Sequence, residues 1–192
     1  MTHPTFRQAR HLVPSKALRA LAIGLFFSCA APAFADELKD IQQLVKRSQF
    51  PQALEKVDAY LGDKPKDAQA RFLKGVIHTE LNQPEAAIEV LSKLSEDYPE
   101  LPEPYNNLAV LYAQQKQYEQ ARVALETAVR AHPSYAIAYE NLGDLYAKQA
   151  SEAYDKAARL DSKNASAQRK LALTRELFSI SNKSAKPART TE

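Results

Sequence analysis

The side chains that most often carry catalysis are few in this sequence and far apart. The chain holds one cysteine, Cys29, and only two of its four histidines, His78 and His132, lie beyond the first 35 residues. These two histidines are 54 positions apart. No Gly-rich phosphate loop, G-x-S-x-G turn or H-E-x-x-H pair occurs. We therefore predict a protein that is not an enzyme, with no metal and no cofactor.

The remaining polar groups indicate a surface rather than a reaction centre. Most carboxylates lie opposite apolar stripes on predicted helices, where solvated side chains are expected. His78 stands at the position that Tyr112 and Tyr146 hold in later helices, which predicts a packing role. Paired-carboxylate catalysis would need a pocket that this pattern does not indicate. The function must then come from the shape of the helical array.

The first 35 residues are typical of a secretory signal peptide. They carry four basic side chains and no acidic one, followed by the apolar run Ala20 to Phe27. Ala33 and Ala35 are the small residues of a cleavage site, which predicts cleavage after Ala35. A retained membrane anchor needs about 18 apolar residues, whereas this run is shorter and Pro32 interrupts the stretch that follows. We expect a periplasmic or otherwise exported protein.

Cys29 leaves a lipoprotein interpretation open. A lipobox has Leu three residues before the cysteine and Gly or Ala directly before it, whereas this sequence has Phe26 and Ser28. If Cys29 were acylated, the protein would be a lipid-anchored assembly factor of the envelope. If the leader is removed before Asp36, the mature chain has no cysteine and no disulfide.

The basic character of the whole chain comes from this leader. The leader carries four of the 26 basic residues and none of the 23 acidic ones, so the remainder has 22 basic residues and a formal charge of −1. The sequence pI of 8.9 thus belongs mostly to the leader. The rest of the chain lacks the basic surface of a nucleic-acid-binding protein. We expect no nucleic acid among its partners.

Residues 102–133 set the pattern for the rest of the chain. They read as two amphipathic helices joined by a tight turn, with apolar residues on a period of 3.6. Neither helix could bury its stripe alone, so similar units must flank this pair. The stripe residues are Tyr105, Leu108, Ala109 and Tyr112 in the first helix and Ala121, Leu125 and Ala128 in the second.

The same unit recurs every 34 residues. Pro65, Pro99 and Pro133 close successive units, and a 34-residue period of paired helices is the signature of one repeat class. The pattern resembles the tetratricopeptide repeat over roughly residues 36–161. The residues that match are Tyr105, Leu108, Ala109, Tyr112, Ala121, Leu125, Ala128 and Pro133, with Leu125 in place of an aromatic residue.

The resemblance implies an all-α fold, a right-handed α-solenoid of helical hairpins. The repeats are expected at 36–65, 68–99, 102–133 and, in degenerate form, 136–162. A capping helix at 165–180 completes a domain over 36–180, and residues 181–192 are expected to be disordered because they lack apolar content. Three prolines near residue 102 predict a longer corner between the second and third units.

The fourth unit departs from the repeat pattern. It lacks the five residues that correspond to 116–120, which form the turn of the third unit. No Gly or Pro occurs from Asp144 to Asp161, and the apolar residues continue along one helical face. We predict one unbroken helix from about Tyr135 to Leu160, as against two short helices.

The concave side of such an array is lined by the first helix of each unit. The resemblance implies that it binds a protein or peptide, and the acidic residues favour a basic partner. The clamp that grips acidic chaperone tails is missing: Asn107 and Asn141 are clamp-like, but Phe72, Val76 and Ile137 are not. The expected partner-binding residues are Gln69, Phe72, Val76, Thr79, Glu80, Glu103, Asn106, Val110, Gln114, Glu140, Asp144 and Lys148, with Ala113, Ile137 and Ala147 among them.

The function that the sequence supports is that of a binding adaptor or scaffold in envelope assembly or maintenance. A self-associating structural protein, paired through the long helix or the concave face, is the alternative from another class. The lipid-anchored assembly factor is a third.

Overall fold

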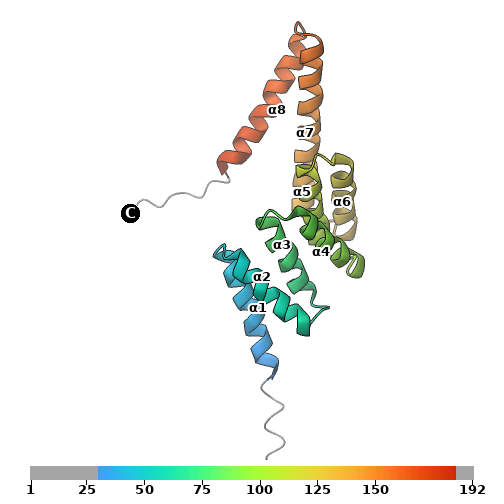
Figure 1. Ribbon diagram of the computed structural model, residues 1–192. Helices are drawn as coiled ribbons and strands as arrows, with labels where there is room; N and C mark the ends of the chain where they lie inside the picture. Colours follow the sequence, from blue (N-terminus) through green and yellow to red (C-terminus); the bar gives the residue numbers. More distant parts are fainter. Residues whose placement is uncertain (1–29, 185–192) are drawn as a thin grey trace, which may run out of the picture.

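The computed structural model describes the backbone of residues 30–184 and the side chains of residues 37–178. Throughout the described backbone every regular element is an α-helix (Figure 1). The predicted leader, including Cys29, lies outside the described residues except for 30–35, which begin the first helix. The helices are α1 (Ala30–Lys46), α2 (Phe50–Asp63), α3 (Ala68–Glu80), α4 (Pro84–Asp97), α5 (Pro102–Gln114), α6 (Tyr118–Ala131), α7 (Ala136–Leu160) and α8 (Ala165–Ser184).

Three identical turns fold the first six helices into hairpins. Each turn has one residue in the left-handed region, namely Ser48 (φ 57), Asn82 (φ 55) and Lys116 (φ 60), spaced 34 residues apart. The backbone amide three residues after the end of the helix then donates to the carbonyl five positions before it, as when Gln117 N–H donates to the Tyr112 carbonyl at 2.8 Å. This bond belongs to the Schellman motif, which satisfies carbonyls at a helix end. The chain reverses there, so the second helix packs antiparallel against the first.

The corners between units are equally regular, and the prediction of a longer corner before the third unit is wrong. The corners 64–67, 98–101 and 132–135 each have four residues. Pro102 and Pro104 do not extend their corner, because both lie in the first turn of α5. A proline is tolerated in that turn because the amides there have no helical partner.

α7 is a single helix of 25 residues, which confirms the prediction for the fourth unit. The residues missing from this unit include the counterpart of Lys116, the left-handed residue that ends α5. Without it the chain has no reversal point, and the helix continues for about 37 Å. Figure 1 shows α7 extending beyond α5 and α6, with α8 folding back from its far end.

α8 starts in the same way as the first helix of a repeat. Asn164 caps it by accepting a hydrogen bond from the Ala167 amide at 2.9 Å, as Asp67 caps α3 through the Ala70 amide at 2.9 Å. Ala167 and Ala70 hold the same place in their helices, and both are buried. α8 ends at Ser184, four residues beyond the predicted limit, so residues 181–184 are helical rather than part of the tail. Residues 185–192 lie outside the described residues.

Most of the buried apolar side chains form two clusters. One lies in α1 to α3 around Ile41, Val57 and Ile77, and the other extends from α4 to α7 around Leu91 and Leu125. α3 and α4 meet where Leu91 packs against the backbone at Gly75. A Cβ atom on Gly75 would lie 2.6 Å from Leu91 Cδ2, so this close approach needs a glycine.

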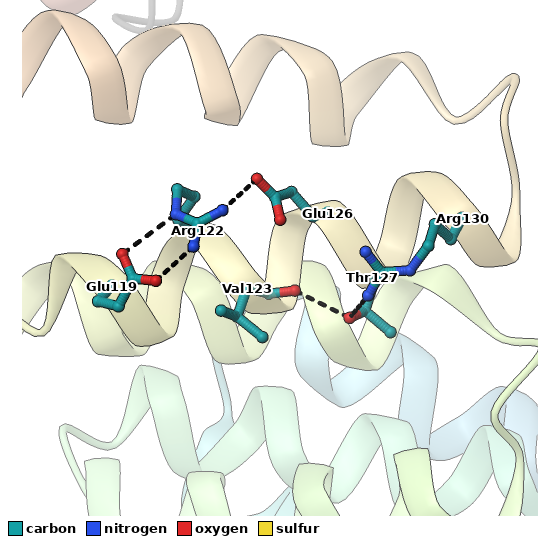
Figure 2. A network of polar contacts seen from close by, with 6 residues as sticks. All are labelled: Glu119, Arg122, Val123, Glu126, Thr127 and Arg130. Carbon is teal, nitrogen blue, oxygen red and sulfur yellow. Dashed lines mark hydrogen bonds and ion pairs between the residues drawn. The ribbon is translucent and has the colours of Figure 1, made fainter.

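α6 carries a polar network on its outer surface (Figure 2). Arg122 forms ion pairs with Glu119, one turn before it, and with Glu126, one turn after it. Arg130 donates to the Thr127 hydroxyl at 2.7 Å. Pairs at spacings of three and four stabilise an exposed helix by only a few tenths of a kcal/mol each. Their role is to support α6 while its opposite side packs in the core.

One polar contact joins α6 to α7. The Tyr118 hydroxyl donates to the Glu152 carboxylate at 2.5 Å. This hydrogen bond, followed by partial burial and the negative charge of Glu152, raises the pKa of Tyr118 to about 12. Tyr118 is also the residue at which α6 begins, so the bond fixes α7 directly beside the last hairpin turn.

The core position of Leu125 gives a first prediction. Leu125→Ala removes a buried side chain at the centre of the larger cluster and should lower the free energy of unfolding by about 2–5 kcal/mol. Val123, two residues away, is 47% exposed, so Val123→Ala should change the free energy of unfolding by less than about 0.5 kcal/mol. Urea denaturation of both variants measures the difference. Equal midpoints would show that the packing register is wrong.

The Tyr118–Glu152 bond gives a second prediction, at alkaline pH. The folded chain retains the phenol proton up to about pH 12, whereas the unfolded chain releases it near the ordinary pKa of 10.0. Because the pKa is raised on folding, the stabilisation is complete below pH 10 and is lost between pH 10 and 12. Tyr118→Phe should therefore make the decline of the urea midpoint with pH shallower. Tyr60 also has a raised pKa, so part of the decline should persist; an unchanged slope would contradict the bond.

Candidate functional site

The first helices of successive units contact one another and form one continuous side of the array. α1 contacts α3, α3 contacts α5, and α5 contacts α7. The residues predicted to bind a partner come from α3, α5 and α7, so they share this side. The structure divides them between two pockets and the surface around them.

The pocket nearer the C-terminus, called here the distal pocket, lies between α5 and α7 and has a volume of about 310 Å³. Five predicted residues line it: Val110, Ala113, Gln114, Asp144 and Lys148. Its floor is apolar because small alanines of α5 and α6 and the core residues Leu125 and Leu145 form it. The full lining is Ala109, Val110, Ala113, Gln114, Tyr118, Ala121, Leu125, Asn141, Asp144, Leu145, Lys148 and Phe178.

The second pocket, called here the proximal pocket, lies between α3 and α5 and has a volume of about 320 Å³. Three predicted residues line it: Gln69, Phe72 and Glu103. The half-buried Phe72 ring provides its apolar wall, together with residues of the corner before α5. The full lining is Ala68, Gln69, Phe72, Leu101, Glu103 and Pro104.

Two aromatic residues that line the distal pocket were not among the predicted partner-binding residues. Tyr118 reaches it from the start of α6, and Phe178 reaches it from α8. Phe178 lies in the pocket because α7 continues without a turn and carries α8 back over the groove. No local pattern around Phe178 indicates this, since its position depends on the whole length of α7.

Asn106 is misplaced in the predicted set. It is buried, and its Oδ1 accepts a hydrogen bond of 2.7 Å from Asn141 Nδ2. The pair joins α5 to α7 beneath the groove, so Asn106 supports the fold and does not face a partner. Asn141 therefore has a structural role, because its side chain holds α7 to α5 through this hydrogen bond. Asn107, the other clamp-like residue, donates to the Glu103 carbonyl one turn earlier at 2.9 Å.

The other predicted residues lie outside both pockets. Thr79 donates its hydroxyl to the Gly75 carbonyl at 3.0 Å, within its own helix. Val76 is half-buried, whereas Glu80 and Glu140 are exposed on the same side of the array. They lie around the pockets rather than within them.

Carboxylates dominate the charge of this side. Among the described side chains, Glu80, Glu103, Glu140 and Asp144 make no ion pair, so their negative charge is not neutralised within the chain. The one cation among the predicted groove residues, Lys148, lies 3.7 Å from Glu152 and pairs with it. An unpaired carboxylate beside an apolar pocket attracts a cationic group.

The two histidines of the described chain each contact a residue close to them in the sequence. His78 Nδ1 lies 2.7 Å from Gln83 Oε1, and His132 Nδ1 lies 3.2 Å from the Ser134 hydroxyl, so each ring contacts only its own turn. Within residues 37–178 no three acidic, histidine or cysteine side chains gather as metal ligands do. The helices described here include none with both the length and the apolar character of a membrane span.

Comparison with solved structures finds the same architecture. The structure superposes on TTC0263 of Thermus thermophilus with a TM-score of 0.57 and 22% identity, over 76% of this chain and 82% of that one. The type III secretion translocator chaperone SycD of Yersinia enterocolitica gives a TM-score of 0.59 at 13% identity, over 66% and 92%. The first TPR domain of human RPAP3 gives a TM-score of 0.57 at 12% identity, over 62% of this chain and 93% of that one. No curated protein matches the chain.

The family models match both halves of the array. A tetratricopeptide repeat model matches residues 41–102, and a TPR repeat model matches residues 111–149. Both fall on the hairpins and on the first part of α7. The turns recur every 34 residues, the hairpins stack side by side, and the family models match these same hairpins. The chain therefore belongs to the tetratricopeptide repeat family.

Proposed function

We propose that the protein is an exported, non-enzymatic adaptor that captures a protein or peptide partner along the side formed by α3, α5 and α7. The observation that carries this proposal is the pair of apolar pockets on one side of the array, each bordered by an unpaired carboxylate, Glu103 at one and Asp144 at the other. Grooves of this kind recognise extended or helical segments through anchor side chains. Tetratricopeptide proteins generally act in this way rather than as enzymes.

The chemistry of the two pockets indicates what the partner segment contains. An apolar side chain would fill each pocket, and a Lys or Arg beside it would face Glu103 or Asp144. One RPAP3 structure holds the acidic HSP90 peptide SRMEEVD. We expect the present groove to have the opposite charge preference. Apolar Phe72, Val76 and Ile137 stand where a carboxylate-binding domain has its clamp residues. The carboxylates Glu103 and Asp144 border the two pockets. We expect a basic segment rather than an acidic one.

The cellular localisation of this adaptor is part of the proposal, and it depends on how the predicted leader is processed. A mature protein that begins at Asp36 would support export and exclude a lipid anchor at Cys29. A mass that corresponds to an acylated chain beginning at Cys29 would favour the lipid-anchored assembly factor. Intact-mass measurement of the protein purified from the envelope fraction distinguishes the two.

A site-specific crosslink gives the third prediction. A photoreactive amino acid placed at Val110, which is 37% exposed in the distal pocket, should crosslink the partner in the intact envelope. The matched control is the same group at Val123, which is exposed on α6 outside the groove. Asp144→Lys should weaken the crosslink from Val110, because it reverses the charge that faces the basic segment.

The helical content of these variants should be unchanged, since Asp144 is exposed and makes no ion pair within the described chain. Equal crosslinking from Val110 and Val123 would contradict binding in the groove. A crosslink from Val110 that Asp144→Lys does not weaken would contradict the basic partner. Asn106 is left unaltered because its loss would leave Asn141 without its partner.

A further inference from the structure

The first half of α7 exposes the face that the other first helices bury inside their hairpins. Tyr139 and Tyr146 are 51% and 48% exposed. Their counterparts in the third unit, Tyr105 and Tyr112, pack against the core cluster beside α6. The exposure follows from the missing turn, because α7 has no second helix folded against it.

The glycines of the two units show the same difference. A Cβ atom on Gly75 would collide with Leu91 of the second helix, whereas a Cβ atom on Gly143, at the same position in the repeat, would have nothing within 4 Å. The fourth unit thus retains the residue that permits a close approach. The described chain provides no helix to make that approach.

The second half of α7 carries the residues that such a helix needs. When the fourth unit is aligned with the third and the five missing residues are left as a gap, Ala150, Tyr154 and Ala157 correspond to three residues of α6. Those residues are Ala121, Leu125 and Ala128, and all three are buried. By contrast, Ala150, Tyr154 and Ala157 are only half-buried. They cannot reach the Tyr139 face of their own chain, because both sets lie on the same straight helix.

The fourth unit does pack against its neighbours on both sides, α6 before it and α8 after it. Leu145 in the first half of α7 belongs to the core cluster that includes α6 residues, and Asp155 in the second half pairs with Arg175 of α8 at 3.1 Å. Lys170 of α8 lies over the Tyr154 ring at 5.4 Å. Within the described chain the interface inside the fourth hairpin is left open, and both of its halves are present.

We propose that two copies of this chain pair through α7 in antiparallel orientation and complete each other's fourth hairpin. The first half of one α7 then packs on the second half of the other, and a twofold axis repeats the contact. The repeat fixes the register: Tyr139 faces Ala157 of the second copy, Gly143 faces Tyr154, and Tyr146 faces Ala150. These residues include no charged side chain, so the pairing buries no unpaired charge.

Gly143→Arg tests the pairing without disturbing the fold of a single chain. The added side chain points into open space, and arginine favours helix more than glycine does, so helical content should be retained or increased. Sedimentation equilibrium should give twice the chain mass for the unmodified full-length protein and the single-chain mass for Gly143→Arg. The matched control, Asp144→Arg, places the same charge one residue further on, towards the groove, and should remain a dimer.

A disulfide tests the register. In a Cys29→Ser background, Tyr139→Cys combined with Ala157→Cys should give a covalent dimer on oxidation, and neither substitution alone should do so. Within one helix the two positions are about 27 Å apart, too far for an internal disulfide. A monomeric unmodified protein, a dimer that survives Gly143→Arg, or equal crosslinking by the single variants would each overturn the proposal. Loss of the dimer in Gly143→Arg with the Val110 crosslink retained would separate this pairing from the groove function.

Discussion

The reversal of the chain at one left-handed residue is the constraint on which this structure depends. A helix with a single apolar stripe gains little until a second helix covers it, and here the cover is always the next segment of the chain. Ser48, Asn82 and Lys116 provide that cover three times by the same backbone geometry. Placing a non-glycine residue in this region costs about 1–2 kcal/mol. The burial of a whole hairpin interface, repeated from unit to unit, outweighs that cost.

Loss of the fourth turn therefore has effects well beyond the turn itself. Five residues fewer convert two short antiparallel helices into one helix, and the direction of everything after it changes. α8 still begins with a side-chain cap and packs on the helix before it, so the rules of the repeat resume beyond the gap. Its new position brings Phe178 to the distal pocket. A deletion in one hairpin thus reshapes the groove formed by its neighbours.

The parts of the fold that depend on short-range pattern could be predicted from the sequence. The 34-residue period, the unbroken α7 and the start of α8 follow from spacing, prolines and the missing turn. The length of the corner before α5 could not, because a proline in a first helical turn and a proline in a loop look alike in sequence. The helical state of residues 181–184 was missed because their composition alone favours disorder.

The candidate site was predictable to a smaller extent. Repeat positions identified the eight predicted residues that line the two pockets, among them Phe72 and Asp144. They failed for Asn106, whose burial depends on its contact with Asn141, a residue 35 positions later. They also failed for Phe178, which reaches the groove through the path of α7 and α8. Side chains whose surroundings are set by distant segments carry no local signal.

The division of the buried residues into two clusters has a consequence for how the array opens. In a linear stack, each unit is held only by its neighbours, so the terminal units can detach at a lower free energy than global unfolding requires. The junction near Gly75 is where α1 to α3 could separate from the rest. The proximal pocket takes its walls from both sides of that junction, from α3 and from the segment that leads into α5. A segment seated there would hold the two bodies together, so occupancy would slow amide hydrogen exchange in the N-terminal hairpin, far from the contact itself.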